Sequence, residues 1–146
     1  MSKADEAVRC FDNGVGFNCC QSVLATYGRE LGLDRETALR LATTFGSGMA
    51  RMGDTCGAVT SAMMVIGLKH GRTRVEDEDA RERAYGLVHE FITRFKARNG
   101  SIVCRDLLGC DPGSPEGQAF LKETGRHKSV CPKLIRDTAE ILEDIL

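Results

Sequence analysis

Residues 56–68 read CGAVTSAMMVIGL, and nearly every position in this stretch is small or apolar. An α-helix that is apolar on all sides is buried in the middle of a protein rather than lying on its surface. Gly71 follows the stretch, and glycine is common just beyond the end of a helix. The stretch therefore predicts a central apolar helix over about residues 55–70.

The segments on either side of this helix also follow a helical pattern, and none of them alternates in the way of a β-strand. Capping residues such as Asn18 and Asp34 stand before some of them. The other expected helices cover about residues 2–12, Asn18 to Leu31, Asp34 to Phe45, 76–98, a start at Ser114-Pro115-Glu116 and a final helix that Pro132 opens. We therefore predict an all-α fold, a compact bundle of five to six helices, that forms one domain over residues 1–146.

The composition is that of an ordinary globular protein with almost no net charge. The 146 residues are 42% hydrophobic and 28% charged, and 20 basic against 21 acidic residues leave a formal net charge of −1. Without an overall field that attracts phosphate or anionic lipid, binding to nucleic acid or to a membrane surface is not expected. The N-terminus has no apolar stretch behind a basic start, and no run approaches the ~20 apolar residues of a membrane span. We therefore expect a cytoplasmic protein, and the sequence is compatible with a homo-oligomer.

Seven cysteines are many for a chain in a reducing compartment, where static disulfides are rare. Four of them stand at or beside predicted helix starts: Cys19, Cys56, Cys104 and Cys131. Free amides and the helix dipole at such positions stabilise a thiolate, which is the form that ligates metals and attacks disulfides. We interpret these four as the candidate site and expect Cys10, Cys20 and Cys110 to fill space in the core.

The four cysteines lie far apart along the chain and form no CxxC pair. This spacing excludes zinc-finger-like and thioredoxin-like patterns, but it allows a site assembled from distant helices. The glycine-rich loop Gly46–Gly53 lacks the GK[ST] ending of a phosphate loop, so we interpret it as a tight connection between helices. Arg51 in this loop and Gly57 beside Cys56 are secondary candidates for contact with a bound group, since Arg51 could neutralise a negative charge. None of the three histidines is expected to be a ligand.

Four pieces of the sequence carry a family resemblance: FNCCQSVL, FGSGMARMGDTCGAVTSA, CRDLLGCD and VCPKLI. In this order and spacing they resemble the C-GCAxxG-C-C family of redox-active proteins, from about Phe17 to the C-terminus. The resemblance implies that Cys19, Cys56, Cys104 and Cys131 are the signature cysteines of the family. The family is also similar to a domain of split-Soret cytochromes, which carry haem, but the lack of a CxxCH motif here argues against covalent haem.

The chain departs from the family pattern at three positions. Ser61 stands where the CGAxxG stretch usually ends in glycine, and Ser47 and Ala50 replace glycines in the preceding loop. We expect a slightly bulkier loop, which would keep a bound group further from the backbone and would leave the cysteine set unchanged.

Three kinds of chemistry are open to four such cysteines. They can hold a [2Fe–2S] or [4Fe–4S] cluster that transfers electrons, or a structural zinc. Two of them can instead cycle between dithiol and disulfide without metal, as in an oxidoreductase or a redox sensor. Alternatively, they are core residues of a helical structural or partner-binding module. Four thiols exceed what an exchange pair needs, which favours a cluster, but the sequence decides neither whether the protein is an enzyme nor which redox partner protein it meets.

Overall fold

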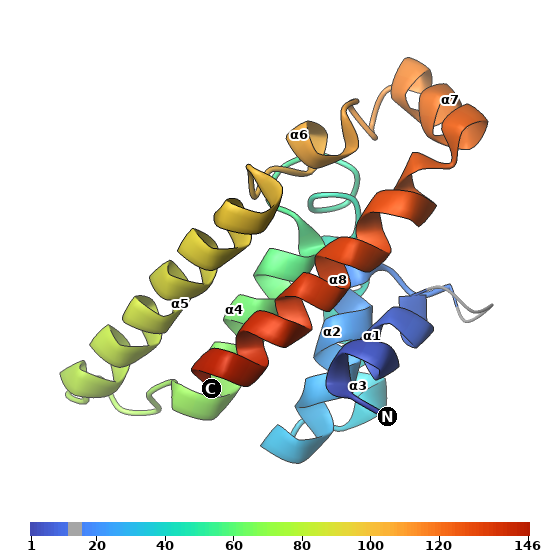
Figure 1. Ribbon diagram of the computed structural model, residues 1–146. Helices are drawn as coiled ribbons and strands as arrows, with labels where there is room; N and C mark the ends of the chain where they lie inside the picture. Colours follow the sequence, from blue (N-terminus) through green and yellow to red (C-terminus); the bar gives the residue numbers. More distant parts are fainter. Residues whose placement is uncertain (12–15) are drawn as a thin grey trace.

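The computed structural model describes residues 1–11 and 16–146, which fold into helices joined by loops (Figure 1). In this part of the chain the α-helices are α1 (Lys3–Phe11), α2 (Cys19–Gly28), α3 (Arg35–Ala42), α4 (Gly57–His70), α5 (Glu78–Asn99), α6 (Cys104–Leu108), α7 (Pro115–Thr124) and α8 (Arg126–Ile145). Two short 3₁₀ turns, η1 (Arg29–Leu31) and η2 (Thr43–Phe45), follow α2 and α3. Residue 12, the expected end of the first helix, lies outside the described residues.

The all-α prediction is confirmed, but the number of helices differs from the five to six expected. The described residues form eight α-helices, because the segment between α5 and α8 folds into two short ones, α6 and α7. Each of these ends at a left-handed glycine, Gly109 and Gly125, whose N–H caps the helix by donating to a carbonyl in its last turn.

The most enclosed helix in the described chain is α2 and not the predicted central helix. Nine of the ten residues of α2 are buried. α4 covers nearly the expected residues and packs against α2, α5 and α8, but it exposes Met63 at 42% and Leu68 at 39%. Although α4 is apolar on all sides, one of its sides is therefore exposed to solvent. No described helix has the length and apolarity that a membrane crossing requires.

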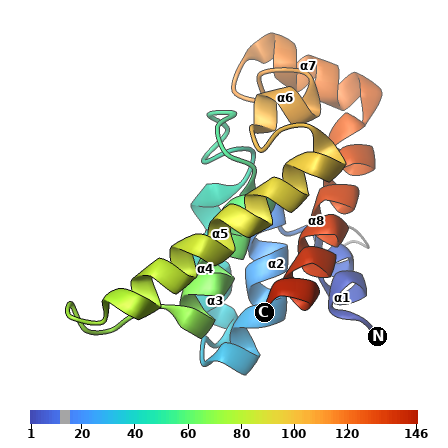
Figure 2. The same ribbon diagram turned by 60° about the vertical axis from the view of Figure 1, so that its left-hand side comes forward.

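Several helices begin at the same end of the bundle. Figures 1 and 2 show that α2 and α4 start near α6, α7 and the first part of α8, while both chain termini lie toward the other end. A capping box fixes the start of α2: the Gln21 N–H donates to Asn18 Oδ1 at 2.8 Å, and the Asn18 N–H donates to Gln21 Oε1 at 3.0 Å. The end of the bundle at which α2 begins is the one that carries the candidate cysteines.

The prediction that Pro132 opens the last helix is wrong. α8 begins at Arg126 and contains Pro132 in its interior. Proline has no N–H, so the Lys128 carbonyl lacks the helical hydrogen bond that residue 132 would donate. Tertiary packing outweighs this loss, because Leu134, Ile135 and later residues of α8 are buried in the core. Cys131 consequently lies within a helix and not at its start.

Polar contacts hold α8 against its neighbours. Tyr27 Oη, on α2, donates to Ala139 O at 3.2 Å. Arg98, near the end of α5, pairs with the buried Asp137 carboxylate at 3.1 Å. These long-range contacts fix the position of α8, and with it that of Cys131, relative to α2 and α5.

Candidate functional site

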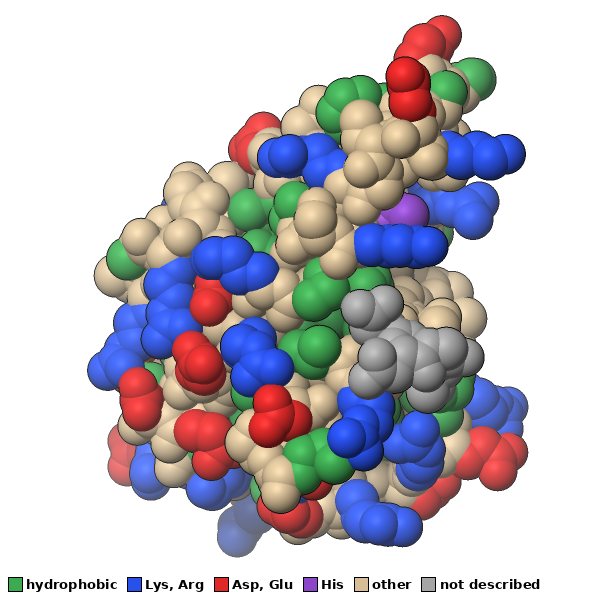
Figure 3. Space-filling view, turned by 45° about the vertical axis from the view of Figure 1, so that its right-hand side comes forward, with side chains coloured by type: hydrophobic (Ala, Val, Ile, Leu, Met, Phe, Trp, Pro, Cys, Tyr) green, Lys and Arg blue, Asp and Glu red, His purple; other side chains and the backbone are tan. Residues whose placement is uncertain are grey.

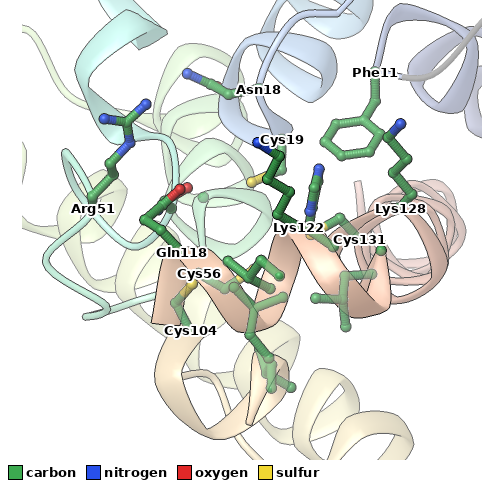
Figure 4. Close-up of a pocket in the computed structure, with 18 of the residues that line it drawn as sticks. Phe11, Asn18, Cys19, Arg51, Cys56, Cys104, Gln118, Lys122, Lys128 and Cys131 are labelled. Atoms are coloured by element: carbon green, nitrogen blue, oxygen red, sulfur yellow. The ribbon is translucent and has the colours of Figure 1, made fainter. Parts of the chain in front are cut away.

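The four candidate cysteines line one cavity, although they lie far apart in the sequence. Cys19, Cys56, Cys104 and Cys131 all contribute to the wall of a cavity of about 600 Å³. Figure 4 shows their side chains around this hollow, which α2, the start of α4, α6 and α8 enclose together. Cys19 is only 8% exposed and Cys56 only 4%. A reactant would therefore reach these two sulfurs through the cavity.

Backbone hydrogen bonds place Cys56 next to Cys104. The Cys56 N–H donates to Ile102 O at 2.7 Å, and the Cys104 N–H donates to Asp54 O at 2.6 Å. An isolated antiparallel bridge joins the same two segments. The segments that lead into α4 and α6 thus run side by side, and the first residues of the two helices lie close together.

The Cys19 sulfur lies beside Gly57 at the start of α4, next to Cys56, and both cysteines line the cavity. A hydrogen bond from the Cys56 thiol is the main cause that lowers the pKa of Cys19 from 9.0 to about 7, and burial of the sulfur opposes this effect. The backbone amides of Cys19, Cys20 and Ser47 also stabilise the anionic sulfur. The same hydrogen bond, together with burial, raises the pKa of Cys56 well above its ordinary value. Cys19 is therefore the more acidic of the two thiols, and Cys56 keeps its proton.

Cys104 and Cys131 are neutral thiols. Burial raises the pKa of Cys104 to about 12, and the charge on Cys19 adds to this effect. Burial and the charges of its neighbours raise the pKa of Cys131 even more. Sequence reasoning expected thiolates at all four positions, but the structure favours the anion at Cys19 alone. Cys104 begins a helix of only five residues and Cys131 is inside α8, so neither meets the amides of a long helix start.

Gly57, a secondary candidate, is the point at which α4 touches the Cys19 sulfur. It is the first residue of α4 and also lines the cavity. A Cβ atom on this residue would lie 2.9 Å from Cys19 Sγ and 2.9 Å from Phe45 O, which is closer than such atoms approach in proteins. The close approach of the sulfur therefore requires glycine here.

The loop between η2 and α4 passes through the left-handed region of backbone conformation. Its residues Ser47–Arg51 all have φ between 52° and 69°. This conformation costs a residue other than glycine roughly 1–2 kcal/mol. It directs the Ser47 N–H toward the Cys19 sulfur and brings both Ser47 and Arg51 to the cavity. Of the two departures from the family loop, Ser47 thus lies at the cavity, whereas Ala50 is exposed.

Replacing Ala50 by glycine is expected to stabilise the protein. Glycine removes the steric cost of φ = 52° at this exposed position, and after the larger entropy of the unfolded chain is subtracted we expect a gain of about 0.5–1 kcal/mol. The free energy of unfolding in urea measures the gain. The matched control is Ala97→Gly on the exposed side of α5, which should lose up to about 1 kcal/mol. Equal losses in both variants would contradict the left-handed assignment.

The opposite wall of the cavity comes from α7 and the start of α8, which sequence reasoning did not single out. Lys122, His127 and Lys128 line it together with apolar side chains. Figure 3 shows a hollow on one face of the molecule, with apolar side chains inside it and basic ones along its upper edge. Nothing in the sequence distinguishes these lysines from ordinary surface lysines, because they come together only when α7 and α8 fold about Gly125.

A single metal ion does not fit the side chains as the structure places them. Across residues 1–11 and 16–146, no group of three or more His, Cys, Asp or Glu side chains is close enough to hold one. An iron–sulfur cluster makes a different demand, because its thiolate ligands surround several separate atoms instead of one. The four cysteines of the cavity match that demand in donor type and in number.

The other three cysteines do not line the cavity. Cys20 is fully buried behind Cys19, accepts a hydrogen bond from Thr60 Oγ1 at 3.9 Å, and has a pKa that burial raises to about 12. Cys10 and Cys110 are only half-buried. The expectation that these three fill space in the core thus fits Cys20 fully and the other two in part.

The fold and the site together define an all-α protein that gathers four cysteines, one of them with a lowered pKa, at a recessed cavity. Residues 17–145 match the family described as "Putative redox-active protein (C_GCAxxG_C_C)". Because the match covers most of the chain, the chain belongs to this family of redox-active proteins. Comparison with curated proteins finds no match, and comparison with solved structures finds none either.

Proposed function

We propose that the protein is a cytoplasmic thiol–disulfide redox protein in which Cys19 and Cys56 are the working pair. The observation that carries this proposal is that the two cysteines lie together at the cavity, where the Cys56 thiol lowers the pKa of Cys19 and itself keeps its proton. An attacking thiol works best when its pKa is close to the ambient pH, and that of Cys19 is about 7. Cys104 and Cys131 stay protonated and do not compete with it.

The proposed reaction passes two electrons from the cysteine pair to a disulfide. The Cys19 thiolate attacks one sulfur of the substrate RS–SR, so that a Cys19–SR bond forms and one RS⁻ leaves. Cys56 then attacks the Cys19 sulfur, and the Cys19–SR bond breaks. The second RS⁻ leaves and takes up the proton that Cys56 loses. The products are a Cys19–Cys56 disulfide, one RS⁻ and one RSH.

The test is the pH dependence of alkylation at Cys19. Only the thiolate reacts with iodoacetamide, so the rate at Cys19 should rise through a midpoint near pH 7, whereas an ordinary cysteine rises near pH ~8.5. Mass spectrometry of tryptic peptides measures the rate at each cysteine separately. Cys104, whose pKa is about 12, should stay almost unmodified over the same range.

Two variants sharpen this test. Cys56→Ala removes the hydrogen bond that stabilises the Cys19 thiolate, so the midpoint for Cys19 should move upward. Cys20→Ala, at the adjacent position, should leave the midpoint unchanged, because Cys20 contacts Thr60 on the core side. If Cys19 in the native protein titrates as it does in the denatured chain, the proposed pair is wrong.

A second candidate, an electron carrier with an iron–sulfur cluster, is supported by the number of sulfurs around the cavity. When bound, the cluster would supply one-electron transfer, and Cys19, Cys56, Cys104 and Cys131 would hold it. Protein purified without oxygen would then contain iron and acid-labile sulfide, and Cys104→Ser would remove both. The thiol–disulfide function instead predicts colourless protein in which Cys104→Ser leaves the alkylation of Cys19 unchanged.

A further inference from the structure

We propose that the cavity binds a small organic anion with an apolar body, and that the disulfide reduced by Cys19 belongs to this class. The reduction rests on the proposed function above, whereas the binding of the anion does not depend on it. Three observations about the cavity support the inference: its charge, its apolar wall and its depth.

Apart from the Cys19 thiol, the charged side chains in the described wall of the cavity are all basic. Arg51, Lys122 and Lys128 line it, and its described wall contains no aspartate or glutamate. The chain as a whole has 20 basic and 21 acidic residues, so this excess is local to the cavity. None of the three basic side chains forms an ion pair within the described part of the chain. Their charges are therefore available to a ligand, which must be anionic to benefit from them.

Much of the remaining wall is apolar, which suits a small molecule. Its large apolar side chains are Phe11, Leu107, Leu108, Leu121 and Leu134. A volume of about 600 Å³ is in the range of small-molecule pockets, about 300–1,000 Å³. In Figure 4, Arg51 lies on one side of the hollow and Lys128 lies beside Phe11 on the other. A ligand between them would place its apolar body against the leucines and its anionic groups near the basic side chains.

The depth of the thiolate favours a small substrate over a protein. Cys19 is 8% exposed and opens into the cavity, so a disulfide on the surface of a folded partner would not reach it.

The basic side chains would also assist the reaction. Each substrate molecule releases one sulfur as RS⁻ when Cys19 attacks and the other as RSH when Cys56 resolves the mixed disulfide. Nearby positive charge stabilises the departing RS⁻, and a more stable thiolate leaves faster. Binding and catalysis would thus draw on the same three side chains.

The binding of anions is tested in a Cys19→Ser background, where no thiol exchange occurs at this position. The probes are 8-anilinonaphthalene-1-sulfonate, an apolar anion, and N-phenyl-1-naphthylamine, which has the same rings without the sulfonate; fluorescence titration gives both dissociation constants. Replacing Lys122 and Lys128 by glutamine should raise the dissociation constant of the anionic probe at least about tenfold. The dissociation constant of the neutral probe should change less than about twofold. The control Lys69→Gln/Lys96→Gln changes the net charge equally and should affect neither probe. Equal effects of the two double variants on the anion would overturn the proposed anion site.

The reaction is tested with two disulfides in protein whose half-buried Cys10 and Cys110 are replaced by serine. These are 5,5′-dithiobis(2-nitrobenzoate), a dianion, and the neutral 4,4′-dithiodipyridine, each of which releases a coloured thiol. The lysine double variant should lower the ratio of their rate constants at least about tenfold. An unchanged ratio overturns the substrate class. A lysine-dependent anion site combined with a Cys19 that reacts with neither disulfide supports the site and rejects the proposed function.

Discussion

Serine in place of Cys19 or of Cys56 is expected to abolish the single intramolecular disulfide that mild oxidation produces in the native protein. The two cysteines lie together at the cavity and the pKa of Cys19 is lowered, so an oxidant that takes two electrons from the pair would join the two sulfurs. Peptide mapping without reductant should find Cys19 joined to Cys56 in the native chain. In either serine variant the surviving cysteine should be found as a free thiol.

The same oxidation should stabilise the native protein strongly. A bond between Cys19 and Cys56 closes a loop of about 38 residues, and the chain-entropy relation gives up to about 4 kcal/mol for a loop of this length. Urea unfolding of oxidised and reduced protein measures the difference. It should vanish in both serine variants, because neither can form the bond.

Cys20→Ser is the matched control, because Cys20 neighbours Cys19 in the same helix but contacts Thr60 in the core. This variant should still form the disulfide and still gain stability on oxidation. A map that joins Cys104 to Cys131, with Cys19 left free, would contradict the assignment of the working pair. Such a result would move the redox role to the thiols whose pKa is raised.

Local rules predicted the parts of this site that depend on neighbouring residues. Asn18 and Gln21 form the capping box that starts α2, and this cap places Cys19 among free amides. The apolar run after Cys56 likewise predicted α4 almost to the residue. In both cases the determining interactions lie within a few positions along the chain, so the sequence alone could reveal them.

The other features of the fold and site depend on contacts between residues far apart in the chain, and such contacts are hard to predict from the sequence. The pKa of Cys19 depends on Cys56, which reaches it only because α2 packs on α4. Proline is usually found at the start of a helix or outside it, but the burial of α8 keeps Pro132 in its interior. Gly48 and Gly53 favour positive φ in the loop, but nothing local predicts it at Ser47, Met49 and Ala50, which are residue types that rarely adopt it.

Replacing Gly57 by alanine is expected to cost about 2–3 kcal/mol of stability, the range for an overpacked core site. The added Cβ atom would meet Cys19 Sγ and Phe45 O at 2.9 Å each, and the backbone oxygen cannot turn aside as a flexible side chain could. The displaced sulfur should also move away from the Cys56 thiol that lowers the pKa of Cys19, so that this pKa rises. Urea unfolding and the pH dependence of Cys19 alkylation measure the two effects.

Gly67→Ala provides the control within the same helix. A Cβ atom there meets nothing within 4 Å, and alanine in a helix interior is better than glycine by about 0.5–1 kcal/mol. The two substitutions, chemically identical and ten positions apart in α4, should therefore change stability in opposite directions. If both substitutions stabilise the protein, the placement of the Cys19 sulfur against the start of α4 is wrong.

A double-mutant cycle then separates the sulfur contact from the backbone contact. In a Cys19→Ala background the Cβ of residue 57 would still meet Phe45 O but no longer a sulfur, so Gly57→Ala should cost less there than in the native chain. The difference is the coupling between the two positions, and for residues in contact it is about 0.5–3 kcal/mol. A coupling of this size would show that glycine stands at position 57 to make room for the reactive sulfur, which ties the start of α4 directly to the chemistry of Cys19.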